Sequence, residues 1–163
     1  FLIFSSKIKS ISSCFISEIF VAVKPNAIIH LGDHFDDGAA MAQEYPHIRF
    51  HQVVGNCDKY RLLRPAPEIL CYDVCGVRLF MTHGHRHNVK ITTGLLLADG
   101  ARNGAAAALY GHTHIAECRQ LPDGMWILNP GACGSFGGSA GLVKIIDGQI
   151  KACSFITAQD LEV

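Results

Sequence analysis

The sequence has no excess of charge of either sign, because 14 Lys and Arg residues balance 14 Asp and Glu residues in a chain of 163. A strongly basic or acidic chain would indicate a highly charged partner. Here no basic patch indicates binding to nucleic acid, and no polybasic tail indicates a membrane surface. The function therefore has to be inferred from a local site and not from the overall charge.

Long apolar runs are absent as well. No stretch reaches the ~18 uninterrupted apolar residues that a membrane-spanning helix requires. The apolar segment 1–23 raises the question of a signal peptide, but Lys7, Lys9 and Glu18 interrupt it and no small-residue cleavage site follows. We therefore interpret this segment as part of the fold.

The seven cysteines show no regular spacing, and only Cys71 and Cys75 lie close together in the sequence. No second close pair follows to complete a zinc site. This pattern favours buried, reduced thiols in a cytoplasmic protein. The glycine-rich segment 131–138 also lacks the Gly-Lys-Ser/Thr sequence of a nucleotide-binding P-loop. Disulfide scaffolds, thiolate zinc sites and P-loop chemistry are thus disfavoured.

The chain does contain enough apolar sequence for one folded domain. Apolar residues make up 49% of it and charged residues 17%, and this length is sufficient for a single core. No internal repeat or low-complexity linker divides the chain, so we expect one domain over residues 1–163.

The patterns of apolar residues predict an α/β protein with mixed sheets. Helices are predicted at 11–23, 39–44 and 92–103. Strands are predicted at 2–4, 27–31, 50–54, 69–72, 77–81, 106–110, 117–120, 125–128, 142–146 and 149–155. Asp123-Gly124 and Asp147-Gly148 are hairpin-turn signals between the last strands. Strand–helix units therefore come first, and antiparallel strands follow.

Four short motifs follow predicted strands in one order along the chain. They are Gly32-Asp33, Gly55-Asn56, His83-Gly84 and Gly111-His112-Thr113-His114. Open α/β sheets bind ligands beyond the carboxyl ends of their strands. One carboxylate, one amide and three imidazoles form a suitable ligand set for a divalent transition metal. The motifs together predict a metal site at one edge of the sheets.

Each motif residue also has a plainer interpretation. Asp33 could cap the following helix, and Asn56 could be a turn residue after its glycine. His112 and His114 could be polar loop residues, although two histidines one residue apart point to opposite sides of an extended chain and suit two adjacent metals. The series of four motifs favours ligation. The candidate metal ligands are Asp33, Asn56, His83, His112 and His114.

These motifs and their order resemble the calcineurin-like metallophosphoesterases, in particular the small YfcE-type phosphodiesterases. The similarity extends from about Ala27 onward and includes His30-Leu31-Gly32-Asp33, Gly55-Asn56-Cys57-Asp58, Met81-Thr82-His83-Gly84-His85, Gly111-His112-Thr113-His114 and Asn129-Pro130-Gly131. The resemblance implies two mixed β-sheets packed as a sandwich and flanked by helices, in four layers α/β/β/α. It also implies a dinuclear metal centre at one edge.

The resemblance further implies a role for each ligand. Asp33 would bridge two metal ions; Asn56, His83 and His112 would complete one site, and His114 would belong to the other. The implied cofactor is a divalent transition metal, with manganese first and nickel, zinc or iron as alternatives. The implied activity is two-metal hydrolysis of small-molecule phosphate esters, mainly phosphodiesters. Neither a membrane nor a nucleic-acid partner is expected, and a homo-oligomer is left open.

The sequence departs from this family at two places. Relatives begin with a strand ending in Asp-x-His, which supplies two more ligands to the second metal; here Ser6, Lys7 and Ile8 stand at the matching positions. Serine is a poor substitute for a carboxylate and isoleucine cannot ligate, so the second site is weakened. Many relatives also carry a histidine proton donor where Cys57 stands, which favours substrates with good leaving groups. Cys57 and His85, which could face substrate or be a plain loop residue, are the candidate catalytic residues.

The missing Asp-x-His raises an alternative from another class of protein. The retromer cargo-binding subunit resembles these enzymes but has degraded ligands, and it acts as a binding module on the same fold. Survival of the five other ligands opposes that interpretation. We therefore expect a metal-dependent phosphoesterase, and a catalytically impaired protein-binding scaffold is the alternative.

Overall fold

The computed structural model describes residues 1–5, 14–58, 66–133 and 138–161. Within them the strands form two five-stranded sheets. Sheet A has the order β10-β9-β1-β2-β3 and sheet B the order β4-β5-β6-β8-β7.

The bounds of the strands follow. In sheet A they are β1 (Leu2–Phe4), β2 (Ala27–His30), β3 (Arg49–Gln52), β9 (Ser139–Ile146) and β10 (Gln149–Thr157). In sheet B they are β4 (Ile69–Val74), β5 (Val77–Thr82), β6 (Ala107–Leu109), β7 (Glu117–Gln120) and β8 (Trp126–Asn129). The helices are α1 (Cys14–Val23), α2 (Phe35–Glu44), α3 (Gly94–Arg102) and the short 3₁₀ helices η1 (His85–His87) and η2 (Ala158–Leu161).

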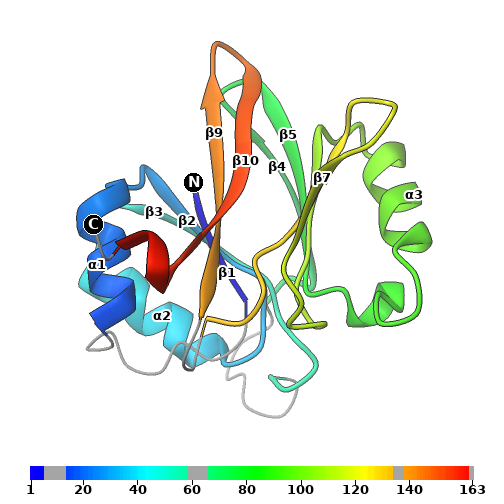
Figure 1. Cartoon of the computed structure of the whole chain (residues 1–163). Coiled ribbons are helices and arrows are strands. Elements are labelled where there is room, and N and C mark those ends of the chain that lie inside the picture. The colour runs from blue at the N-terminus through cyan, green and yellow to red at the C-terminus, as the bar shows by residue number, and fades with distance from the viewer. Residues whose placement is uncertain (6–13, 59–65, 134–137, 162–163) are drawn as a thin grey trace.

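The two sheets pack face to face and the helices cover their outer faces. Figure 1 shows α1 and α2 against sheet A and α3 against sheet B, so the layers run α/β/β/α. Both sheets contain parallel and antiparallel pairs, as in β1 with β2 and β1 with β9. The predicted fold, a sandwich of two mixed sheets flanked by helices, is confirmed.

Side chains of β1 show how the sandwich is filled. Successive residues of a strand point to opposite faces of the sheet. Ile3 accordingly joins the core between the sheets, together with Leu79 of sheet B. Leu2 and Phe4 point the other way and pack with Ile19 of α1. All three residues of the strand are buried, which explains why this run is continuously apolar.

The parallel strands bring the predicted motifs to one end of the sandwich. In sheet A, β1, β2 and β3 are parallel neighbours, and in sheet B, β5, β6 and β8 are parallel neighbours. The loops that leave the carboxyl ends of β2, β3, β5 and β6 carry the four motifs. These loops gather at the lower end in the view of Figure 1.

Some element bounds differ from the sequence prediction. Helix α2 begins at Phe35 and not near residue 39, because Asp36 and Asp37 occupy its first turn, where acidic side chains favour a helix. Strand β9 begins at Ser139 and not at residue 142, because it pairs with β10 along its whole length. Both expected hairpins form around their Asp-Gly pairs. None of the helices among the described residues is long and apolar enough to cross a bilayer.

Candidate metal centre

The imidazole of His83 lies at the centre of the site and is buried. Its Nδ1 is 2.7 Å from the carbonyl oxygen of Leu31, which can only accept, so Nδ1 carries a proton. Its Nε2 lies 3.4 Å from Oδ2 of Asp33 and 3.2 Å from Oδ1 of Asn56. With His83 neutral, three electron-rich atoms therefore face one another. A bound cation would satisfy all three.

The side chain of Asp33 turns toward His83 and not toward helix α2. The residue at the start of that helix is His34, which makes no capping hydrogen bond with its side chain. Oδ1 of Asp33 instead accepts a hydrogen bond from the backbone N–H of Cys57 at 3.0 Å. The helix-capping interpretation of Asp33 is therefore wrong, and its carboxylate is placed for the site.

The environment of Asp33 keeps its carboxylate ionised. Burial alone would raise its pKa. The contact with His83 and the hydrogen bond from the backbone N–H of Cys57 outweigh burial, so the pKa of Asp33 lies well below its ordinary value. Asp33 can thus offer a negatively charged oxygen near neutral pH.

His112 is a half-buried neighbour of this group. Its ring centroid lies 5.0 Å from that of His83 and 6.2 Å from that of His85. Burial, followed by repulsion from His83 and Lys90, lowers the pKa of His112 to about 4. The imidazole is therefore neutral near pH 7, which is the form that binds metals.

The remaining predicted residues lie at different distances from this centre. The ring of His85 is half-buried and 5.4 Å from that of His83. Cys57 is exposed, and its sulfur accepts a hydrogen bond from Nδ2 of Asn56 at 3.5 Å. His114 is exposed, and no described hydrogen bond or ring contact joins it to the other predicted ligands. The structure therefore brings together four of the five predicted ligands and leaves His114 at the rim.

Ligation would still require some movement of side chains. Within residues 1–5, 14–58, 66–133 and 138–161, no three His, Cys, Asp or Glu side chains are placed as they stand to hold one ion. The preformed part is the convergence of Asp33, Asn56 and His83, in which one donor is an amide. His112 would have to approach this group from its present position beside it.

The backbone around the ligands adopts a conformation that side chains rarely accept. Asp33, His34, His112 and His114 have φ angles of 62°, 57°, 68° and 61°. This left-handed region is uncommon for residues other than glycine, and such strain is concentrated at functional sites. The left-handed conformation occurs in two separate motif loops. The surrounding fold therefore holds both loops in a backbone conformation that these residues disfavour.

The sequence model of the calcineurin-like phosphoesterase superfamily domain matches residues 13–147. The chain belongs to this superfamily. The predicted resemblance is thus confirmed. No match to a curated protein sequence was found.

Several solved structures of this fold are similar to the chain. A predicted phosphoesterase from Streptococcus pneumoniae TIGR4 has a TM-score of 0.72 and 23% identity, over 96% of this chain and 88% of that one. Wild-type Vps29 from Entamoeba histolytica, complexed with zinc, has a TM-score of 0.64 and 16% identity, over 96% and 99%. A novel archaeal phosphodiesterase has a TM-score of 0.56 and 18% identity, over 96% and 98%. At these identities the likeness establishes the shared fold.

Asp58 belongs to the motif Gly55-Asn56-Cys57-Asp58, and the sequence alone gave it no role. It is only 2% exposed. Its Oδ2 accepts hydrogen bonds from the backbone N–H groups of Asp33 at 3.0 Å and Gly55 at 2.8 Å. Its Oδ1 accepts one from Phe35 at 3.0 Å. This carboxylate therefore connects the loop after β2 to the loop after β3. The sequence signal for this role was an acidic residue three positions after Gly55.

Two further residues, Asn129 and His87, support the histidine loops of this superfamily member. Nδ2 of Asn129 donates to the carbonyl oxygen of Gly111 at 3.0 Å and to Oγ1 of Thr113 at 2.9 Å, so Asn129 braces the loop that carries His112 and His114. Nε2 of the buried His87 lies 2.9 Å from Oδ2 of Asp99, which connects η1 to α3. Sequence reasoning gave His87 no role, because its partner lies on a separate element.

The divergent start of the chain meets this site at Ser5. Strand β1 ends at Phe4, and the buried Ser5 packs so closely on Gly111 that an added Cβ there would lie 2.2 Å from the serine Oγ. Ser6, Lys7 and Ile8, which replace Asp-x-His, lie outside the described residues. Their predicted effect on a second metal site stays a prediction.

Proposed function

We propose that this superfamily member is a metal-dependent phosphoesterase that hydrolyses phosphodiesters. The observation that carries the proposal is the convergence of Asp33, Asn56 and His83. Oδ2 of Asp33 lies 3.4 Å and Oδ1 of Asn56 lies 3.2 Å from Nε2 of His83. The buried carboxylate of Asp33 is ionised, and the imidazole of His83 is held in one tautomer. Such hard oxygen and borderline nitrogen donors suit Mn²⁺ or Zn²⁺.

The proposed ligands of the first metal are Asp33, Asn56, His83 and His112, and those of a weaker second metal are Asp33 and His114. A bound divalent cation would supply charge to polarise the phosphoryl group and favour attack by water. The chain itself orients the donors: Leu31 holds the tautomer of His83, and the low pKa of His112 keeps it neutral. We propose manganese, with nickel, zinc or iron as alternatives.

Two residues beside the ligands are proposed to act on the substrate. His85 is half-buried next to His83 and His112, where it can hydrogen-bond a phosphoryl oxygen. The exposed thiol of Cys57 lies beside Asn56 and can donate a proton to a leaving group, less readily than a histidine would. Good leaving groups, such as an aryl oxide, are therefore the expected substrates. A cytoplasmic location and a homo-oligomer stay predictions.

The test combines metal binding with turnover. Purified protein freed of metal is titrated with Mn²⁺ by calorimetry and assayed with bis(p-nitrophenyl) phosphate. We expect a Mn²⁺-dependent release of p-nitrophenol and a loss of affinity of more than roughly tenfold in His112→Ala. His47→Ala, which removes an exposed imidazole outside the site, is the matched control. Turnover that does not change with added metal would refute the proposal.

A binding module on the same fold is the second candidate, and the replacement of Asp-x-His by Ser6, Lys7 and Ile8 favours it. Metal content alone does not separate the two candidates, because a Vps29 complexed with zinc shares this fold. Turnover does. Stoichiometric Mn²⁺ without hydrolysis of any aryl phosphodiester would favour the binding module.

A further inference from the structure

Two cysteines from different sheets meet at one side of the sandwich. Cys118 lies in β7, the edge strand of sheet B, and Cys153 lies in β10, the edge strand of sheet A. Their sulfur atoms are 3.0 Å apart, and both cysteines are free and half-buried. We infer that Cys118 and Cys153 are a site of reversible oxidation, at which a disulfide joins the two sheets.

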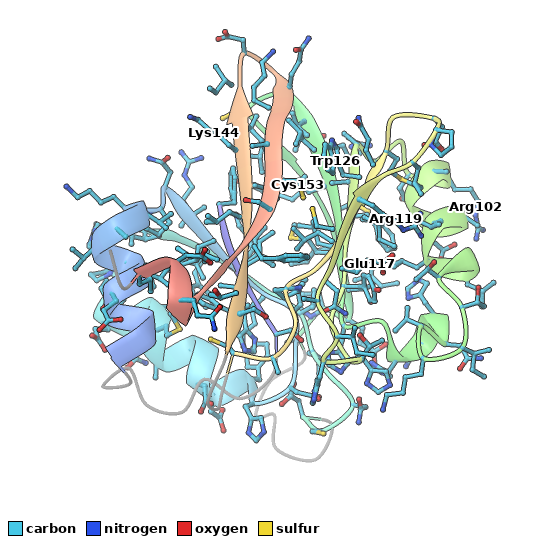
Figure 2. All side chains as sticks on the ribbon, in the orientation of Figure 1. Arg102, Glu117, Arg119, Trp126, Lys144 and Cys153 are labelled. Carbon is cyan, nitrogen blue, oxygen red and sulfur yellow. The ribbon has the colours of Figure 1, made fainter. Side chains whose placement is uncertain are left out.

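The direction of the β7 side chains explains why these thiols face each other. Figure 2 labels Glu117 and Arg119 on β7 and Cys153 on β10. The Tyr110 hydroxyl donates a hydrogen bond to Oε2 of Glu117, and Tyr110 belongs to the cluster between sheet B and α3. Neighbours along a strand point to opposite faces, so Cys118 points inward. Both cysteines accordingly pack against the core between the sheets.

The geometry requires only a small movement to form the bond. A disulfide has a sulfur–sulfur distance of about 2.05 Å, so the thiols must approach by roughly 1 Å from their present 3.0 Å. The pairing of β10 with β9 shifts register between Ile150 and Ala152, immediately before Cys153. An irregular edge strand can adjust more readily than a central one.

A metal site is a weaker use of the same two thiols. Structural metal sites with cysteine ligands take four donors. In the part of the chain that the structure describes, no third His, Cys, Asp or Glu side chain joins this pair in a position to hold an ion. Two sulfurs in contact with each other, without further donors, fit oxidation better than ligation.

The chemistry balances with a small-molecule disulfide as the oxidant. The thiolate of one cysteine attacks oxidised glutathione, forms a mixed disulfide and releases one glutathione thiolate. The second cysteine then loses its proton and attacks the protein sulfur of the mixed disulfide, which releases the second glutathione. Burial raises the pKa of both thiols, so attack proceeds through the small ionised fraction of either cysteine. The bridge forms as two electrons pass to the oxidant.

The bridge would close a loop that includes the brace of the metal centre. Residues between Cys118 and Cys153 include Asn129, whose amide group holds Gly111 and Thr113. A covalent link between the edge strands lowers the conformational entropy of the unfolded chain and so raises the free energy of unfolding. We expect the melting temperature to rise by roughly 5–15 °C on oxidation and to return on reduction. The inference does not depend on the proposed catalytic function.

The experiment treats the full chain with oxidised glutathione, blocks remaining thiols and digests it with trypsin. Cleavage after Lys and Arg places Cys118 on the peptide 103–119 and Cys153 on the peptide that begins at Ala152, with no other cysteine on either. We expect these two peptides to be joined, with a mass about 2 Da below their sum for the two hydrogen atoms lost. Cys71 and Cys75, both exposed, supply the control.

The variants separate this bridge from oxidation elsewhere. Cys71→Ser with Cys75→Ser should keep the rise in melting temperature, and Cys118→Ser or Cys153→Ser should lose it. Recovery of both peptides with blocked thiols from oxidised wild-type protein overturns the inference. So does a bridge from Cys118 or Cys153 to another cysteine, or a lasting glutathione adduct on either. Because the peptide analysis uses the wild-type chain, it remains decisive if a serine variant does not fold.

Discussion

The buried carboxylate of Asp58 accepts a hydrogen bond from the backbone N–H of Asp33 at 3.0 Å, so one acid positions the main chain of another. The same oxygen accepts the N–H of Gly55. The loops after β2 and β3, which carry Asp33 and Asn56, are thus joined through one side chain. Metal ligands depend on such supporting contacts for their orientation. This arrangement can be tested without knowing the substrate.

Asp58→Asn should weaken both the fold and the metal centre. One oxygen becomes an NH₂ group that cannot accept the backbone N–H groups now bonded to it. Loss of charge-assisted hydrogen bonds in a buried position should lower the free energy of unfolding by about 2–4 kcal/mol. Mn²⁺ affinity should fall roughly 10–100-fold. Urea denaturation and calorimetry measure the two effects.

Asp73→Asn is the matched control for this change. Asp73 pairs with Arg78 on the exposed surface of β4 and β5. Exposed pairs contribute little to stability, and this one lies near the hairpin end of β4 and β5, away from His83. Equal effects of the two substitutions on Mn²⁺ affinity would show that Asp58 does not support the site.

Gly55→Ala should displace the carboxylate of Asp33. A Cβ at Gly55 would lie 2.1 Å from Oδ1 of Asp33 and 2.3 Å from its backbone nitrogen. Overpacking of this kind costs about 1–3 kcal/mol, and the movement should reduce Mn²⁺ binding. Gly94→Ala, where the nearest atom is 3.5 Å away, should change neither stability nor binding strongly. A Gly55→Ala protein with wild-type affinity would mean that Asp33 is not a ligand.

Stability of the metal-free protein should depend on pH through His112. Its pKa is about 4 in the folded chain, against an ordinary value of about 6.5 when unfolded. Between these values the unfolded chain binds more protons, so the free energy of unfolding falls as the pH drops from about 6.5 to 4. The pKa of His51 is also lowered, by burial and then by Arg49, and acts in the same direction.

His112→Asn removes this contribution and should make the decrease between pH 7 and pH 4.5 shallower. Urea denaturation at both pH values measures the decrease. His47→Asn, at an exposed position, should keep the wild-type decrease. A His112→Asn protein with an undiminished decrease would contradict the lowered pKa of His112.

Restoring the family motif at the start of the chain should strengthen a second metal site. Ser6→Asp combined with Ile8→His recreates Asp-x-His after the first strand. We expect the Mn²⁺ stoichiometry to rise toward two per chain and the hydrolysis of an aryl phosphodiester to increase. Ser10→Asp with Ser12→His adds the same groups out of register and serves as the control. No gain over that control would mean that the alignment of the first strand is wrong.

The fold was largely predictable because several of its strands, among them β1, β2 and β6, are buried throughout and form largely apolar runs. Ala27–His30 is a short apolar run ended by glycine, and the structure has a buried strand there. The exact start of β9 was not predictable, because its first residues pair with the end of β10, far along the chain. Pairing of this kind depends on tertiary structure and leaves only a weak local pattern.

The candidate site was predictable in composition and only partly in arrangement. Carboxylate, amide and imidazole groups after successive parallel strands had to lie at one edge. The same reasoning could not separate His112, which lies beside His83, from the exposed His114. His112 and His114 both have left-handed backbone conformations. These turns of the loop determine where each imidazole lies, and the spacing in the sequence does not reveal them.

The sequence by itself determined which donor groups the candidate site contains, their order along the chain, the α/β class and the superfamily. Those are properties of side chains and of local periodicity. Only the tertiary structure decided that Asp58 holds the backbone of Asp33 and that Cys118 meets Cys153. The spacing of the cysteines indicated mostly buried, reduced thiols and could not show this pair, because contact between edge strands of two sheets depends on packing and not on separation along the chain.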